Sequence, residues 1–153
     1  MLRDFSLPTY REIPAVGLYL DQTSKYINEV LQDLPDCNIT NSKISNYVKH
    51  HLISNPVKKQ YSRDQIACLI FIAVTKNTLS LDEVAAVFEM QKGTCEIREA
   101  YVTFSETFEN YLHGDGQMTY EETDSAELRL LRRIVVTVVN HYHLNEELNQ
   151  LRK

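Results

Sequence analysis

The segment from Thr40 to Arg63 contains five lysine and arginine residues and no acidic residue. It belongs to a chain of 153 residues whose formal net charge is −5. We call residues 40–63 the basic island. Because its charge opposes that of the whole chain, the island would attract a polyanion to one face of the protein. This pattern predicts recognition of nucleic acid, and the alternative interpretation is a solvated protein surface.

The candidate contact residues of the island fall into two groups. The first combines amide, hydroxyl and ammonium side chains, which suit base edges and phosphate oxygens: Ser42, Lys43, Ser45, Asn46 and Lys49. The second follows Pro56, which stiffens the chain, and would lie along the DNA backbone: Lys58, Lys59 and Arg63. We expect sequence-specific binding from the first group and backbone contacts from the second.

Helix signals indicate how the island is held. Thr40 is a predicted N-cap of a helix over 40–52, whose apolar face is formed by Ile44, Tyr47, Val48 and Leu52. A preceding helix over 18–34 would brace it. Pro56 excludes a helix through 54–60, so this strip is expected to form a short β-like wing. The order of helix, helix and wing is that of a winged helix-turn-helix reader.

The remaining segments predict further helices. Capping boxes begin at Ser62, Ser80 and Thr119, and the helix over 66–74 is apolar all round, which places it at the centre of the fold. A fifth helix starts near Thr94 and carries an aromatic stripe expected in the core. Residues 134–139 are rich in β-branched side chains and suit either a strand or a helix; the periodicity around them favours helix.

Composition limits the class of protein. Hydrophobic residues make up 43% of the chain, three cysteines form no C-x-x-C pair, and no apolar run is long enough for a membrane span or a signal peptide. We expect a cytoplasmic, all-α protein without a membrane contact. Its predicted parts are an extended arm (1–17), a winged helix-turn-helix domain (18–92) and a helical hairpin with a tail (93–153).

The second half of the chain is expected to do something other than bind DNA. Between Asp82 and Glu127 there are twelve acids and two bases, a balance that repels nucleic acid. Apolar steps along the last helix favour a homodimer contact: Leu128, Leu131, Val135, Val138 and Tyr142. A dimer would also suit the two-fold geometry of helix-turn-helix readers.

Residues 39–84 resemble the DNA-binding module of MerR-type regulators. The resemblance rests on the segments ITNSKISNYVKHHLI, SNPVKKQYSRDQI and LSLDEV. It implies a winged helix-turn-helix that puts helix 40–52 in the major groove and strip 54–61 on the phosphates. In this chain His51 stands where that family usually has a glycine at the end of the reading helix, and the wing lacks a Gly-Tyr-Arg tip.

The whole chain is more closely similar to a bacterial family known only as domain-of-unknown-function family 1836. Its pattern is carried by LP, EIP and LYLDQ near the start, then by IT, NYVK, PVKK, YSR and LS with EV. This resemblance implies no activity, so it leaves the function open.

No enzyme chemistry is predicted. The sequence has no nucleophile motif, no metal-ligand spacing and no glycine-rich phosphate loop, so we expect no catalytic residue, no metal and no cofactor. The predicted partner is double-stranded DNA, and the predicted role is regulation of transcription. The sequence does not identify a small-molecule effector. The alternative is a non-enzymatic protein-protein interaction module or adaptor.

Overall fold

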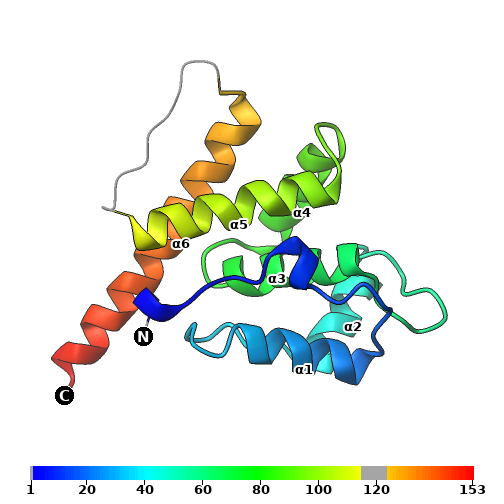
Figure 1. The fold of residues 1–153 in the computed structure, drawn as a ribbon, viewed down its shortest axis with the longest axis horizontal. Helices are drawn as coiled ribbons and strands as arrows, with labels where there is room; N and C mark the ends of the chain where they lie inside the picture. The colour runs from blue at the N-terminus through cyan, green and yellow to red at the C-terminus, as the bar shows by residue number, and fades with distance from the viewer. Residues whose placement is uncertain (1, 115–123) are drawn as a thin grey trace.

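The computed structural model describes residues 2–114 and 124–153 (Figure 1). This part of the chain is all-α, as predicted, and contains six α-helices, two short 3-10 helices and no strand. The 3-10 helices are η1 (Leu2–Asp4) and η2 (Tyr10–Glu12). The α-helices are α1 (Leu20–Val30), α2 (Asn41–Lys49), α3 (Arg63–Thr75), α4 (Leu81–Lys92), α5 (Ile97–His113) and α6 (Ala126–Leu151).

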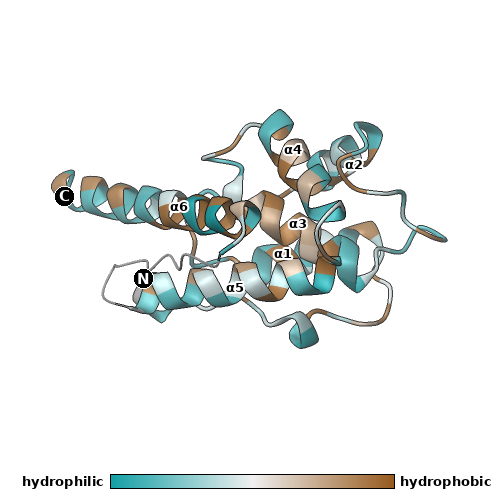
Figure 2. Ribbon diagram, turned by 90° about the horizontal axis from the view of Figure 1, so that it is seen from above, coloured by the Kyte–Doolittle hydropathy of each residue, from teal (hydrophilic) through white to brown (hydrophobic). Residues whose placement is uncertain are grey.

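Helix α3 lies at the centre of the fold, as its apolar composition predicted. Ten of its thirteen residues are buried. It packs against α1 on one side and α5 on another, and it is brown along most of its length in the hydropathy colouring of Figure 2. A helix that is apolar all round is stable only when other elements cover every side, and the rest of the chain provides that cover.

Three of the predicted helix starts are confirmed in atomic detail. The Thr40 hydroxyl accepts from the Lys43 amide at 3.2 Å, at the start of α2. Complete capping boxes begin α3 at Ser62 and α4 at Ser80. The fourth predicted start, the capping box at Thr119, lies outside the described residues.

Several helices are shorter than the sequence predicted. Helix α1 covers Leu20–Val30, not 18–34, since turns occupy the residues after Leu31. Helix α2 ends at Lys49, three residues before the expected position. Helix α5 begins at Ile97 because the Thr94 hydroxyl instead donates to the Met90 carbonyl at 2.9 Å, near the end of α4.

Residues 134–139 are helical within α6, which resolves the choice between helix and strand. Val135, Val138 and Val139 are fully buried, and α6 packs along α5. Burial of these β-branched side chains outweighs their weak preference for strand. Three of the five positions expected to form a dimer contact, Val135, Val138 and Tyr142, are therefore used inside the chain.

The aromatic stripe of α5 lies in the core, as expected. Phe104 packs edge-on against Phe71 of α3 with ring centres 5.0 Å apart, and Phe108 makes an edge contact with Phe5 at 6.1 Å. Such edge-to-face pairs add to the area that the rings bury. They connect the N-terminal residues, α3 and α5 in one core.

Tyr142 joins α6 to the first half of the chain. Its hydroxyl donates to the Val74 carbonyl at 2.8 Å, in the last turn of α3, where carbonyls have no partner within the helix. Because that bond uses the only hydroxyl proton, the Cys37 thiol must donate to the Tyr142 oxygen. Burial, the largest effect, raises the pKa of the Cys37 thiol to about 11, so the thiol keeps its proton.

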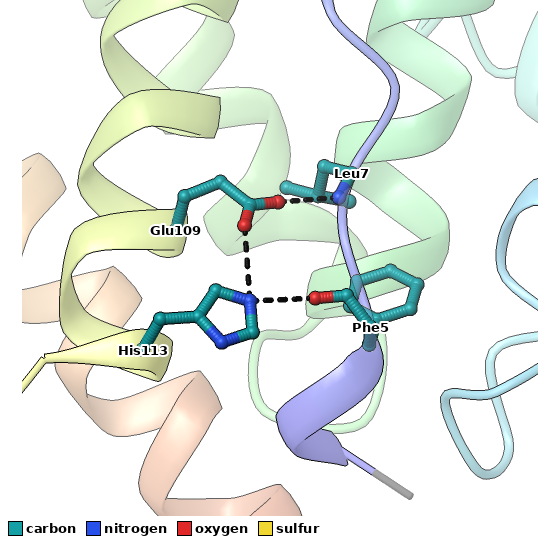
Figure 3. A network of polar contacts seen from close by, with 4 residues as sticks. All are labelled: Phe5, Leu7, Glu109 and His113. Carbon is teal, nitrogen blue, oxygen red and sulfur yellow. Dashed lines mark hydrogen bonds and ion pairs between the residues drawn. The ribbon is translucent and has the colours of Figure 1, made fainter.

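The sequence predicts an extended N-terminal arm, and residues 2–17 have no regular secondary structure outside two short 3-10 helices. The arm forms η1 and η2 and lies across α5 and α3, with Phe5, Leu7 and Ile13 buried. Figure 3 shows how it is held at its start: Glu109 accepts from the Leu7 amide at 2.5 Å and lies 3.2 Å from His113. The His113 ring nitrogen is 2.7 Å from the Phe5 carbonyl.

The arm is held again further along. The Tyr101 hydroxyl of α5 donates to the Pro8 carbonyl at 2.6 Å, and the Tyr10 hydroxyl donates to Asp64 of α3 at 2.5 Å. The first contact satisfies a backbone carbonyl that has no regular secondary structure to pair with, and the second joins two side chains. The arm thus packs against α5 and α3.

Replacing Tyr142 with phenylalanine is expected to lower the free energy of unfolding by about 1–3 kcal/mol, because the Val74 carbonyl and the Cys37 thiol lose a buried partner. Chemical denaturation followed by far-UV circular dichroism measures the change. Tyr19→Phe, at a half-exposed ring, is the control and should change the stability by less than about 0.5 kcal/mol. Equal effects of the two substitutions would contradict the role of the Tyr142 hydroxyl.

Candidate nucleic-acid interface

Helix α2 buries one face and exposes the other. Ile44 and Tyr47 are buried against the body of the protein. The five predicted contact residues are all exposed to solvent: Ser42, Lys43, Ser45, Asn46 and Lys49. Ser42, Ser45, Asn46 and Lys49 are spaced three and four apart, so they lie along one side of the helix. The structure thus brings this first group of candidates together.

The end of α2 depends on a left-handed residue. His51 has φ 61°, its amide donates to the Val48 carbonyl at 3.0 Å, and the Leu52 amide donates to the Tyr47 carbonyl at 2.8 Å. This pattern is a Schellman motif, which usually has glycine at the left-handed position. His51 therefore adopts, at this position, a backbone conformation that usually requires glycine.

A tight turn carries the second group of lysines. Val57 and Gln60 exchange backbone hydrogen bonds of 3.1 and 2.9 Å, and between them Lys58 and Lys59 have φ 52° and 64°. Two consecutive positive φ angles are those of a type I′ turn, in which Asn-Gly is the usual pair. Both lysines are exposed, and in Figures 1 and 2 the turn projects from the body on the side away from the C-terminal end of α6.

The base of this turn is fixed to the body at two places. Leu18 and Tyr61 pair as an isolated antiparallel bridge, with hydrogen bonds of 3.1 and 2.8 Å. Gln65, buried in α3, donates its side-chain amide to the Ser54 carbonyl at 2.9 Å and to the Asn55 carbonyl at 3.1 Å. Gln65 is the last residue of the capping box that begins at Ser62, and it also anchors the segment before the turn.

Arg63 makes different contacts from the other candidates. Its Nε donates to the Ile13 carbonyl at 2.8 Å, a terminal nitrogen donates to the Arg11 carbonyl at 3.3 Å, and the guanidinium lies 5.2 Å from the centre of the Tyr10 ring. Arg63 is half-buried under the N-terminal arm. The structure therefore does not bring Arg63 together with the exposed lysines, although it belongs to the basic island.

Lys76 joins the surface from outside the island. This residue follows α3, and its ammonium donates to the Asn38 carbonyl beside the start of α2. Burial chiefly lowers the pKa of Lys76, and the nearby charge of Lys43 lowers it further. Two ammonium groups this close repel each other unless an anion lies between them. No local sequence signal indicates this pairing, because it arises only when the end of α3 lies beside the segment that precedes α2.

Acidic groups also approach the start of α2. The Asn41 side chain donates to the Asp21 carboxylate, and the Ser24 hydroxyl contacts the Asn41 oxygen at 2.6 Å. Asp36 raises the pKa of Lys76, in opposition to Lys43. These contacts attach α2 to α1 at its N-terminal end, and the exposed lysines extend along the helix away from them.

A family model covers most of this architecture. It matches residues 8–111, which include the second part of the arm from Pro8 onward, α1 to α4 and nearly all of α5. The chain belongs to the family described as a domain of unknown function, DUF1836. The match is shorter than the full-length similarity inferred from the sequence, and it extends across the predicted boundary between 92 and 93. No curated protein and no solved structure matches the chain.

Other kinds of site are not seen among the residues that this DUF1836 structure describes. No group of three or more histidine, cysteine or acidic side chains is arranged to hold a metal ion in residues 2–114 and 124–153. Within the same residues, no helix has the length and hydropathy needed to cross a bilayer.

Replacing His51 with glycine is expected to raise the free energy of unfolding by about 0.5–1 kcal/mol. Relief of left-handed strain, roughly 1–2 kcal/mol, exceeds the entropic cost of glycine. His50, whose φ is −90°, is the matched control, because glycine there should destabilise the protein by about 0.5–1 kcal/mol. Denaturant unfolding measures the change in the free energy of unfolding of each variant. A loss of stability in both variants would contradict a strained left-handed residue at the end of α2.

Proposed function

We propose that this protein binds double-stranded DNA through α2 and regulates transcription. In this proposal α2 enters the major groove, where Asn46 reads adenine and Lys43 and Lys49 contact guanine or phosphate. Ser42 and Ser45 donate to phosphate oxygens. In this proposal α2 acts as the reading helix of a MerR-like winged helix-turn-helix, and the turn Val57–Gln60 acts as its wing.

The observation that carries the proposal is the exposed face of α2 together with Lys76. All five candidate side chains of α2 are exposed. Burial chiefly lowers the pKa of Lys76, and the ammonium of Lys43 lies close enough to lower it further. A phosphate between the two would relieve their repulsion, and the N-terminal end of α2 adds its own partial positive charge. This supports a phosphate contact at the start of the reading helix.

The turn Val57–Gln60 supports a backbone contact. Left-handed conformations for two adjacent lysines cost roughly 1–2 kcal/mol each, and glycine would avoid that cost. Unusual backbone conformations concentrate at functional sites. Two charges at the tip of a projecting turn suit phosphates beside the groove that α2 occupies, where their role would be orientation and affinity, not sequence reading.

A second candidate function is a protein-protein interaction module or adaptor. The observation that favours it is the apolar face at the end of α6, where Leu144, Leu148 and Leu151 are exposed. This end of α6 projects from the body in Figures 1 and 2. The same leucines offer apolar surface for a homodimer, which remains part of the DNA-binding proposal. Weak DNA binding that is lost near physiological salt and shows no preferred sequence would favour the adaptor.

Alanine at Lys43, Asn46 or Lys49 is expected to weaken binding to a DNA site selected from a random pool by about 1–3 kcal/mol each. Fluorescence anisotropy with the labelled site measures the loss. Lys92→Ala removes an equally exposed lysine from α4 and serves as the control, with affinity unchanged. Binding that is insensitive to all three substitutions in α2 would overturn the proposal.

The lysines of the turn should act differently. Removing Lys58 or Lys59 is expected to reduce the slope of log affinity against log salt by about 1 each, and to weaken selected and unrelated DNA about equally. Titrations at several salt concentrations, with both DNA sequences, measure this. A loss confined to the selected sequence would instead mean that the turn reads bases.

A further inference from the structure

A pocket lies between α3, α4, α5 and the first turns of α6. Its volume is about 360 Å³, within the range of small-molecule sites. Its walls are formed mainly by apolar side chains, among them Phe71, Phe88, Phe104, Leu128 and Leu131. The Phe71 ring is held by Phe88 at 5.6 Å and by Phe104 at 5.0 Å, so the aromatic wall is formed before any ligand enters.

The pocket exists because α4 packs loosely. Only Val84 of its twelve residues is buried. Val87, Phe88 and Met90 are left half-buried and line the pocket. Protein interiors are normally close-packed, and apolar walls that face an open space forgo both dispersion contacts and burial. An apolar occupant would recover them.

The charged residues of the pocket wall are acidic. Among the described residues that line it, Glu99 of α5 and Glu127 of α6 carry charge, and no lysine or arginine is present. Lys92 and Arg98 line an adjoining polar groove instead. The N-terminal end of α6 contributes roughly half a positive charge, which is smaller than that of the two carboxylates. The pocket is therefore negative overall.

Three further contacts show where the neighbouring charges lie. The Lys92 ammonium is 3.9 Å from Glu89, and Arg98 lies over the Tyr10 ring at 5.8 Å. Arg132 of α6 pairs with Asp124. Glu99 is close to the wall itself: burial chiefly raises the pKa of the Cys95 thiol, and the charge of Glu99 raises it further. Cys95 lines the pocket.

We propose that this pocket binds a small molecule with an aromatic or aliphatic body and a positively charged amine. The apolar walls would take the body, the two carboxylates would attract the ammonium, and the ring faces would add cation–π attraction. An anion of the same shape would be repelled. The proposal stands apart from DNA binding and holds whether or not α2 contacts nucleic acid.

The test compares two probes that share one body, 2-naphthylmethylammonium and 2-naphthoate. Isothermal titration calorimetry on the full chain at low salt should show that the ammonium binds more tightly, by about tenfold or more. Equal affinity, tighter binding of the naphthoate, or no binding of either probe would overturn the proposal.

Variants locate the binding. The double substitution Glu99→Gln with Glu127→Gln should lower the affinity for the ammonium probe by about tenfold, without lowering that for 2-naphthoate. Glu106→Gln, at an exposed acid of α5 that does not line the pocket, is the matched control and should have no effect. If the double variant binds the ammonium probe as tightly as the unmodified protein, the proposed site is wrong.

Filling the pocket supplies an independent test. Ala100 lines it, and Ala100→Phe should abolish binding of the ammonium probe in a protein whose circular dichroism is unchanged. Retained binding in that folded variant would overturn the proposal. If Ala100→Phe does not fold, the pair of glutamate substitutions still decides the question, because Glu99 is exposed and Glu127 only half-buried.

Discussion

The fold depends on the burial of one helix. Helix α3 has almost no polar face, so it becomes stable only when elements on every side exclude water from it. This explains why the chain keeps helices from both halves, and an irregular N-terminal segment, against the same core. The buried residues form one cluster that extends from Leu2 to Tyr142. The exposed surfaces of α2, α5 and α6 are what this packing leaves for function.

Features set by local chemistry could be predicted from the sequence. A hydroxyl followed three residues later by glutamine or glutamate satisfies backbone groups within one turn, so Ser62 and Ser80 begin helices wherever those helices pack. The apolar run of α3 identified the centre of the core, because a helix that is apolar all round must be buried. The polar side of α2 followed from its periodicity, and its candidate contacts are exposed as expected.

Features that depend on distant partners could not be predicted. The arm buries Phe5, Leu7 and Ile13 at irregular spacing, and its hydrogen-bond partners lie on α5 and α3, so no period indicates its course. Lys76 reaches the basic surface only because the end of α3 lies beside the segment before α2. Arg63 lies away from that surface because its guanidinium donates to backbone carbonyls of the arm. The pocket under α4 likewise reflects how closely helices approach, which composition does not specify.

The position of the arm has a consequence for the order of folding. The contacts of Phe5 and Leu7 with α5 join residues 108 and 102 positions apart. During synthesis the arm leaves the ribosome long before α5, the helix on which it packs. Contacts of such long sequence separation form late. The arm is therefore among the last parts to dock, and until then the side of α3 and α5 beneath it is open to water. Of the elements described here, the first to be made is thus expected to be among the last to join the core.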